Sequence, residues 1–236
     1  MAETEAARRE REYWDRHARN YDRSMRVLGG PMPRMLALVA QTVRAELRPG
    51  GEVLEVAAGT GLVTEVLAEI AVDTGATVTA TDYSEEMVRE VRLRMEQRGL
   101  SRVVWCEEAD LYELLYEDAS FDVVVAANVL HLVPDLPRAL AALLRVLRPG
   151  GRLVVPTFCH DQTWWSRLVS RVLALTGFPG HRRFSTTSLR AAVQAAGAEV
   201  ARVETLRGLL PIGYVEAIWP GAPAPVPDAS APDDER

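Results

Sequence analysis

Cysteine is scarce in this chain of 236 residues, which contains only Cys106 and Cys159. Two cysteines are too few for the disulfide framework of a secreted protein, and they fit a reducing compartment. No apolar run approaches the ~20 residues that a membrane-spanning helix needs, and the first dozen residues contain no apolar core of a signal peptide. We therefore expect a cytoplasmic protein that is neither exported nor integral to a membrane.

An excess of positive charge is also missing, because the formal net charge is -6 at pH 7. Broad electrostatic binding of DNA or RNA requires a basic surface, so we expect no nucleic-acid partner. The composition, 48% hydrophobic and 25% charged, is that of an ordinary globular protein. We expect one domain over residues 1–219, with N-terminal helices at 1–48 as a cap, a helical insertion at 160–184 and a disordered tail at 220–236.

Helical and strand-like hydrophobic patterns alternate along most of the chain. The patterns predict helices over 33–47, from the turn after residue 61 to about 71, from 84 to about 99, over 136–147 and from 185 or 187 to 196. Ser84 is the expected N-cap of the third of these helices. They predict strands over 52–56, 76–81, 103–106, 121–127, 152–158, 199–206 and 209–218.

This alternation predicts an α/β fold with a doubly wound, mostly parallel seven-stranded sheet. Apart from Asp122, the run 121–127 is apolar, as in a strand that is buried on both faces. The last two strands are separated by too few residues for a crossover, so we expect them to pair as a C-terminal antiparallel hairpin.

The first predicted strand runs into a turn of small residues, from Glu55 to Gly61. Small residues let a ligand approach the backbone at the carboxyl edge of a parallel sheet, where doubly wound folds bind ligands. Asp82 ends the second strand, and a carboxylate there accepts hydrogen bonds from the two hydroxyls of a ribose. The two features together predict a nucleoside-like ligand.

Five segments occur in the order typical of one family: YWDRHARNYD, VLEVAAGTG, ATDYSEEM, the stretch from EEADLYEL to FDVVVAANVLHLV, and LRPGGRLVV. In this respect the sequence resembles the class I S-adenosylmethionine-dependent methyltransferases, especially the type 11 group that includes the ubiquinone and menaquinone biosynthesis enzymes. The resemblance covers roughly residues 13–218. It implies a Rossmann-like fold and S-adenosyl-L-methionine as cofactor. The tryptophan-bearing segment 161–177 leads us to expect a small, partly apolar or lipid-like methyl acceptor.

The resemblance also implies which residues hold the cofactor. Glu55 would begin the glycine-rich motif, Asp82 would hold the ribose, and Asn128 would face the methyl donor. The complete implied set is Tyr21, Glu55, Ala57, Gly59, Thr60, Gly61, Asp82, Tyr83, Met87, Asp110, Leu111 and Asn128. Met87 would lie near the adenine, Asp110 would accept from its amino group, and Tyr21 would close over the cofactor.

Structural alternatives exist for several of these residues. Glu55 is alternatively a satisfied strand-end carboxylate, and Asp82 a helix-capping acid. Met87 is alternatively a core residue, and Asp110 and Asn128 turn or cap residues. One position departs from the family pattern: Ala57 replaces the first glycine of the motif, and its methyl group would strain the turn if the backbone requires a positive φ.

Two histidines are candidate catalytic bases, because histidine titrates near neutral pH. His131 follows the strand at 121–127, and His160 follows the strand at 152–158, so both are expected near the carboxyl edge. His131 is alternatively packed at a strand-helix junction. For His160, with Asp161 beside it, we expect a surface loop. No metal is required for methyl transfer from a sulfonium.

The segment 161–177 has an apolar helical stripe that includes Trp164, Trp165 and Leu168, with Ser166, Arg167, Ser170 and Arg171 opposite. Three roles suit this stripe: a cap over a hydrophobic substrate, a peripheral contact with a membrane, or packing on the domain. The run 181–183, His-Arg-Arg, is either a solvated loop or a site for an anionic head group.

Two other functions compete with a methyltransferase. A nicotinamide-dependent oxidoreductase requires G-x-G-x-x-G, which this turn lacks because Thr64 occupies the third glycine position counted from Gly59. A protein that binds the cofactor without transferring a methyl group would keep the same motif, because a fold does not prove an activity.

Overall fold

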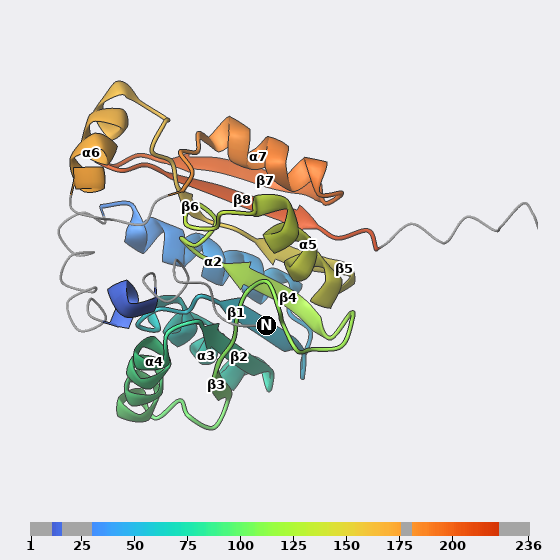
Figure 1. Cartoon of the computed structure of the whole chain (residues 1–236). Helices are drawn as coiled ribbons and strands as arrows, with labels where there is room; N and C mark the ends of the chain where they lie inside the picture. The colour runs from blue at the N-terminus through green and yellow to red at the C-terminus, as the bar shows by residue number, and fades with distance from the viewer. Residues whose placement is uncertain (1–10, 16–29, 176–180, 222–236) are drawn as a thin grey trace, which may run out of the picture.

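The computed structural model describes residues 11–15, 30–175 and 181–221, and its elements alternate as expected (Figure 1). After a helical turn at residues 11–15 come α2 (Met32–Glu46), β1 (Glu52–Val56), α3 (Leu62–Thr74), β2 (Thr77–Asp82), α4 (Glu85–Arg98), β3 (Val104–Glu108), β4 (Phe121–Ala126), α5 (Leu136–Val146), β5 (Leu147–Val154), β6 (Thr157–Phe158), α6 (Trp164–Leu175), α7 (Thr186–Ala195), β7 (Glu199–Leu206) and β8 (Ile212–Ile218). The expected tail, residues 220–236, lies largely outside the described residues.

A mostly parallel sheet forms the centre of the molecule. Strands β3, β2, β1, β4 and β5 are parallel neighbours in that order, and β8 continues the sheet antiparallel to β5. The chain therefore builds outward from β1 to β3 and then returns to the other side of β1. The carboxyl ends of β1 and β4 form the switch point at which doubly wound sheets bind ligands.

Within the described ranges the sheet has eight strands, where seven were predicted. The run expected as one strand over 152–158 is divided into β5 and β6, and Pro156 lies between them without an N–H to donate. Both pieces pair with β8. The predicted antiparallel hairpin of β7 and β8 is confirmed, although β8 begins at Ile212 rather than at residue 209.

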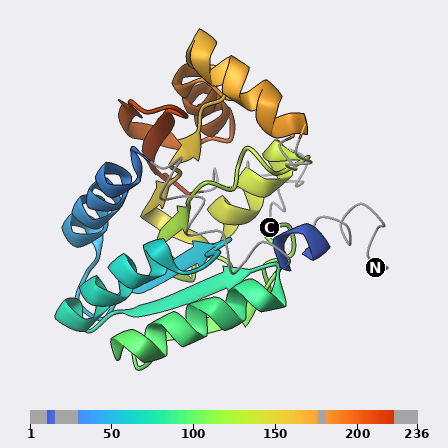
Figure 2. The same ribbon diagram turned by 90° about the vertical axis from the view of Figure 1, so that its left-hand side faces the viewer.

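Helices cover both faces of the sheet. Helices α2, α3 and α4 pack in sequence on one face, and Figure 2 shows them side by side. Helices α5 and α7 pack on the other face. Strand β1 serves both cores by alternation, because Val53 belongs to the first core while Leu54 and Val56 belong to the second. The same alternation directs Glu55 toward the α3 side.

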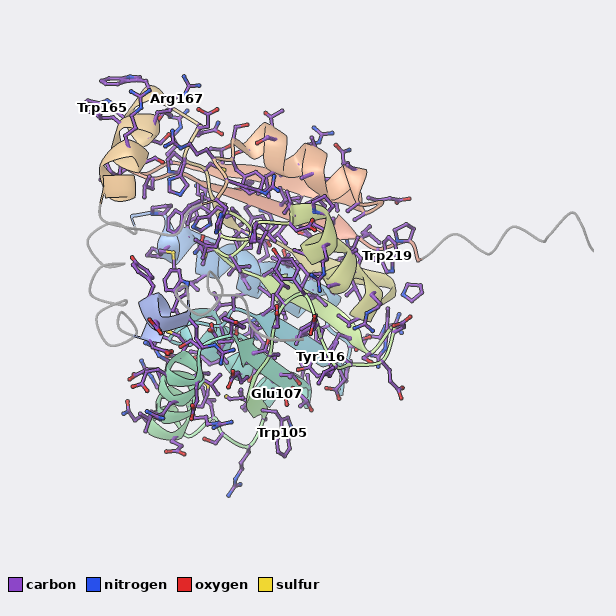
Figure 3. The ribbon with its side chains drawn as sticks, viewed as in Figure 1. Trp105, Glu107, Tyr116, Trp165, Arg167 and Trp219 are labelled. Carbon is purple, nitrogen blue, oxygen red and sulfur yellow. The ribbon has the colours of Figure 1, made fainter. Side chains whose placement is uncertain are left out.

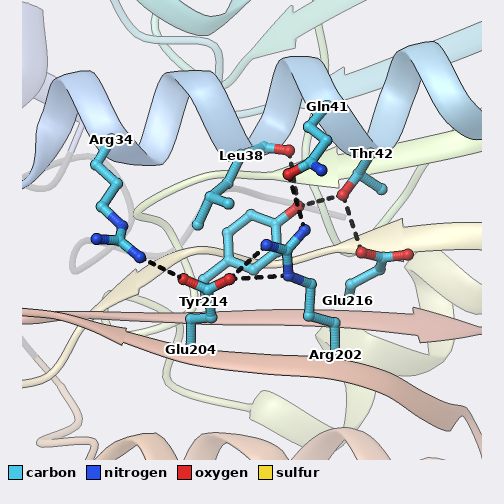
Figure 4. A network of polar contacts seen from close by, with 8 residues as sticks. All are labelled: Arg34, Leu38, Gln41, Thr42, Arg202, Glu204, Tyr214 and Glu216. Carbon is cyan, nitrogen blue, oxygen red and sulfur yellow. Dashed lines mark hydrogen bonds and ion pairs between the residues drawn. The ribbon is translucent and has the colours of Figure 1, made fainter.

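A network of polar contacts attaches α2 to the hairpin (Figure 4). The Tyr214 hydroxyl, on a fully buried side chain, lies 2.7 Å from Thr42 Oγ1. Thr42 in turn donates to a Glu216 carboxylate oxygen at 2.9 Å, and Arg152 lies 3.6 Å from the other oxygen of Glu216. Since each of these buried groups has a partner, the network fixes α2 against β8.

None of the helices in the described ranges is long and apolar enough to span a lipid bilayer.

Candidate functional site

The turn after β1 has a left-handed backbone. Ala57 has a φ of 53°, and Gly59 and Gly61 have φ values of 59° and 83°. Ala57 therefore has the positive φ that strains a residue with a side chain. A left-handed conformation costs an L-residue about 1 kcal/mol or more, so the turn stores strain at its first position.

The two glycines have different functions in this turn. A Cβ atom built on Gly59 would meet no atom of the described residues within 4 Å, whereas one on Gly61 would lie 3.3 Å from Val91 Cγ1 on α4. Gly61 thus permits α4 to pack closely on the start of α3. Gly59 leaves open space beside its backbone, which is the condition for a ligand to approach there.

Asp82, at the end of β2, is joined to this turn. Its Oδ2 atom accepts a hydrogen bond from Gly59 N at 2.8 Å, and its Oδ1 atom accepts one from Ser84 N at 3.0 Å. Burial raises the pKa of Asp82 to about 6, although these backbone hydrogen bonds oppose the rise. A carboxylate has about four acceptor positions, so Asp82 retains capacity for the two hydroxyls of a ribose.

Glu55 points toward α3, as its place in the β1 alternation requires. Its side chain is 1% exposed and accepts a hydrogen bond from Thr64 Oγ1 at 2.6 Å. Burial raises the pKa of Glu55 to about 8; the Thr64 hydrogen bond opposes the rise and the charge of Asp82 adds to it. This contact matches the alternative in which Glu55 is a satisfied strand-end carboxyl. Thr64 was not predicted as the partner of Glu55.

The first turn of α4 borders the same edge. Ser84 caps the helix as predicted, since its Oγ accepts a hydrogen bond from Met87 N at 3.1 Å. Met87 is 2% exposed. Ser84 therefore joins the Met87 backbone to the end of β2, because its own N–H donates to Asp82.

The helical turn at residues 11–15 covers the ends of β2 and β3 (Figures 1 and 2). Asp15 accepts a hydrogen bond from Ser84 Oγ, and the Arg11 guanidinium lies 4.1 Å from the centroid of the Tyr83 ring. Arg11 also pairs with Glu108 at 2.6 Å. Arg11 and Asp15 were not predicted from the sequence, because their partners lie roughly 70 or more residues away in the chain. Tyr21 lies outside the described residues.

The remaining adenine-side candidates lie after β3. Asp110 Oδ1 accepts a hydrogen bond from Tyr112 N at 2.8 Å, as expected for the alternative in which Asp110 is a turn residue. Its neighbour Leu111 is half-buried against the second core. Thr60, between the two glycines of the first turn, is buried.

Asn128 follows β4 at the switch point and also has a left-handed backbone, with a φ of 54°. Its Nδ2 atom lies 3.7 Å from Met32 Sδ and 3.8 Å from Met35 Sδ, both on α2. Its Oδ1 atom is buried and has no hydrogen-bond partner among the described residues. A buried acceptor without a partner costs about 1–3 kcal/mol, so this oxygen is suited to receive a donor from a ligand.

The structure brings the two candidate histidines together. The rings of His131 and His160 have centroids 5.4 Å apart, and Phe158 packs edge-on against His131 at 5.9 Å. His131 is 2% exposed and His160 is 5% exposed, so the expectation of a surface loop for His160 is wrong. Burial, reinforced by His160, lowers the pKa of His131 to about 3, and burial lowers the pKa of His160 as well.

The loop that begins at His181 is joined to this histidine pair. The N–H groups of His181 and Arg182 both donate to the His131 carbonyl oxygen at 3.0 Å. The Arg182 side chain donates to the Pro134 carbonyl oxygen at 2.9 Å. Arg182 is therefore committed to the protein backbone, whereas Arg183 is exposed.

Helix α6 packs on the domain only partly as expected: Val169 contacts the first core, but two serines replace the tryptophans on the buried side. Ser166 and Ser170 are buried, while Trp164, Trp165 and Leu168 are 65%, 54% and 46% exposed. The packing role for these three apolar side chains is therefore wrong. Within the part of the chain that the structure describes, no three His, Cys, Asp or Glu side chains are grouped as a metal site requires.

Comparisons with known proteins agree with this arrangement. Residues 54–155 match the model of a methyltransferase domain. A ubiquinone/menaquinone biosynthesis C-methyltransferase, UbiE of Ectopseudomonas mendocina, is 36% identical over 158 residues, which are 67% of this chain and 61% of that relative. The chain thus spans less than two thirds of the length of this relative.

Solved structures share the fold. A S-adenosylmethionine-dependent methyltransferase from Aquifex aeolicus superposes with a TM-score of 0.61 at 23% identity, covering 76% of this chain and 89% of its own. The [4+2]-cyclase SpnF superposes with a TM-score of 0.66 at 21% identity, covering 80% and 81%. The predicted doubly wound α/β fold is therefore confirmed, and the chain shares it with the solved S-adenosylmethionine-dependent methyltransferase from Aquifex aeolicus.

Proposed function

We propose that the chain transfers a methyl group from S-adenosyl-L-methionine to a small, partly apolar acceptor. The observation that carries this proposal is the junction of Gly59 and Asp82 at the carboxyl edge of the sheet. Gly59 leaves open space for a ligand, and it donates to the carboxylate that would receive a ribose. The match of residues 54–155 to a methyltransferase domain supports the same activity.

Named residues would hold the cofactor. Asp82 would accept from the ribose hydroxyls, and Met87 and Asp110 would border the adenine. The partnerless Asn128 Oδ1 would accept a hydrogen bond from the methionyl ammonium. The left-handed turn at Ala57, Gly59 and Gly61 would lie against the methionyl chain. Tyr21 remains a proposed closing residue.

The bound cofactor would supply a methyl group already activated on a sulfonium, so the protein's own contribution is alignment and exclusion of water. Methyl transfer would leave S-adenosylhomocysteine, and an acceptor that carries a proton at its reacting atom would release that proton to solvent. We propose that the imidazoles of His131 and His160 bind the methyl acceptor. Both side chains are buried, and the lowered pKa keeps His131 neutral and able to accept a hydrogen bond.

We further propose that the acceptor is a quinone-type or other lipid-like molecule and that the protein acts in the cytoplasm, in contact with a membrane through residues 161–177. The relative from Ectopseudomonas mendocina is named as a ubiquinone/menaquinone biosynthesis C-methyltransferase, which favours an apolar ring acceptor. Cys106 and Cys159 are both free thiols, which supports a reducing compartment.

Transfer of labelled methyl from S-adenosylmethionine into a cell lipid extract tests the activity. We expect a labelled, organic-soluble product with the full chain and a slower rate of labelling with Asp82→Ala when S-adenosylmethionine is limiting. Labelled product at the same rate from both proteins would contradict the role of Asp82.

A second function is kept because a [4+2]-cyclase has the same fold. The fold therefore hosts proteins whose named activity is not methyl transfer. Binding of S-adenosylhomocysteine in calorimetry, with no labelled product from any extract fraction, would favour a protein that binds the cofactor without transfer. Binding of NAD instead would favour an oxidoreductase.

A further inference from the structure

Helix α6 has an unusual distribution of side chains between its two faces. Ser166 and Ser170 are buried, and Val169 packs against the first core. Trp164 and Trp165 are exposed, and their rings stack with centroids 4.0 Å apart. A surface helix normally buries its apolar stripe, whereas α6 exposes Trp164, Trp165 and Leu168 among the side chains that the structure describes.

The exposed face combines apolar and cationic groups. Trp164, Arg167, Leu168 and Arg171 follow one another at the spacing i, i+3, i+4 and i+7, so they share one face of α6. All four are exposed. We call these four residues together with Trp165 the α6 face. Trp is the side chain that most favours the boundary between water and lipid, and arginine binds phosphate through two parallel hydrogen bonds.

The segment around this helix is positively charged, whereas the chain as a whole is negatively charged. Residues 160–190 contain five arginines and one acidic residue, Asp161, while the whole chain has a net charge of -6. Arg167 is paired with Asp161 at 2.5 Å, but both side chains are about half exposed, and such surface pairs contribute little free energy. Arg167 can therefore exchange its contact with Asp161 for a lipid phosphate.

The α6 face projects at one end of the molecule. Figure 3 shows Trp165 and Arg167 at the tip of α6, at the end opposite Trp105 on β3. Three apolar side chains are far fewer than the 20 to 30 residues a side of a stable protein interface. They suit shallow insertion into a lipid surface, which requires only a few aromatic anchors beside cations.

We propose that the α6 face docks the protein on an anionic lipid membrane. This inference deepens the proposed function and rests on it only for the identity of the methyl acceptor. A docked α6 would place the His131–His160 pair near the membrane from which an apolar acceptor enters. The backbone links that pair to α6 directly, because His160 precedes the helix by only four residues.

Sedimentation of the full chain with lipid vesicles tests the docking. We expect binding to vesicles of phosphatidylcholine with added phosphatidylglycerol, weaker binding to phosphatidylcholine alone, and a decline as salt is raised. The variant Trp164→Ala/Trp165→Ala should bind about tenfold more weakly, and Arg167→Gln/Arg171→Gln should also bind about tenfold more weakly.

Matched variants serve as controls. Trp105→Ala removes a tryptophan that is 68% exposed at the other end of the molecule, and Arg44→Gln removes an exposed, ion-paired arginine of α2. Both should bind vesicles as the unmodified chain does. Asp82→Ala should lose cofactor affinity and keep vesicle binding, which separates failure of the docking from failure of the proposed activity.

Three results would overturn the docking proposal. The first is absence of binding to the anionic vesicles. The second is equal loss of binding in Trp105→Ala and in the Trp164/Trp165 variant. The third is a dimer in solution that dissociates in the Trp164/Trp165 variant, since the α6 face would then be a contact between two copies of the chain.

Discussion

Two buried polar regions of this molecule differ in how completely their groups are paired. In the network between α2 and the hairpin, the Tyr214 hydroxyl, Thr42 and Glu216 all have partners (Figure 4). At the carboxyl edge, by contrast, Ala57 has a strained φ of 53° and Asn128 Oδ1 has no partner among the described residues. Both of these unfavourable features lie at the edge where the ligand is proposed to bind.

This difference suggests a division between stability and function. Strain and unpaired polar groups persist at a site only where surrounding structure enforces them, and they are common at functional sites. Changes in the α2 network should therefore lower stability without changing ligand affinity. Changes at the carboxyl edge should alter affinity or turnover, and some should raise stability.

The largest expected effect concerns the pH dependence of stability at Glu55. Its pKa is raised from 4.5 to about 8 by burial, so the folded protein binds its proton more tightly than the unfolded chain. The associated stability is present below pH 4.5 and is lost as pH rises toward 8, by several kcal/mol. Glu55→Gln, which keeps an acceptor for Thr64, should remove most of this decline in denaturant titrations from pH 5 to 8.5. An equally steep decline in the variant would contradict the buried, protonated Glu55.

Asp82→Ala should weaken binding of S-adenosylhomocysteine by about 1 to 3 kcal/mol, because the ribose hydroxyls would lose a charged acceptor. Titration calorimetry measures this change. The control is Asp122→Asn, which alters a carboxylate that pairs with Arg148 and accepts from Glu52 N at the opposite edge of the sheet. Equal affinity in Asp82→Ala and the unmodified chain would remove Asp82 from the site.

His131→Ala should lower turnover by about tenfold and leave cofactor affinity unchanged, since the imidazole is proposed to hold the acceptor rather than the cofactor. Because the pKa of His131 is lowered to about 3, its protonation should add no acidic limb to the rate between pH 5 and 8. His181→Ala, which removes an exposed histidine, provides the control. Unchanged turnover in His131→Ala would make His131 a packing residue.

Tyr214→Phe should lower the free energy of unfolding by about 1 kcal/mol, because the hydroxyl contacts Thr42 and donates to the Leu38 carbonyl oxygen. Affinity for S-adenosylhomocysteine should stay the same. Denaturant titration and calorimetry on one preparation measure both quantities. A loss of affinity without a loss of stability would reverse the proposed division between the two regions.

The smallest expected effect is at Ala57. Ala57→Gly should raise the free energy of unfolding by about 0.5 kcal/mol, since relief of the positive φ exceeds the entropy that glycine adds to the unfolded chain. Ala40→Gly, in the middle of α2, should instead lower it. A destabilised Ala57→Gly variant would show that the turn is not strained.

Much of the fold was predictable from hydrophobic periodicity and turn residues. The strand at 52–56, the Ser84 cap and the antiparallel hairpin were all predicted and are confirmed. The division of the strand around Pro156 was not predicted, because continuous apolar character outweighed the missing N–H of proline. Periodicity reports which side of an element is apolar but not which side faces the core, so it could not reveal that α6 buries two serines and exposes Trp164 and Trp165.

The site was only partly predictable. Asp82 and the glycine turn follow from local sequence, because both lie at the ends of adjacent strands. The Glu55–Thr64 contact, the Asp15–Ser84 contact and the pairing of His131 with His160 depend on how segments pack in space. No local pattern encodes those distances, so the burial of His160 could not be anticipated.

A crystal structure of the full chain grown with S-adenosylhomocysteine tests the central claim most directly. The account predicts both ribose hydroxyls within hydrogen-bond distance of the Asp82 carboxylate and the methionyl chain over the backbone of Gly59. A nucleoside bound elsewhere, or side chains filling the space beside Gly59, would contradict it.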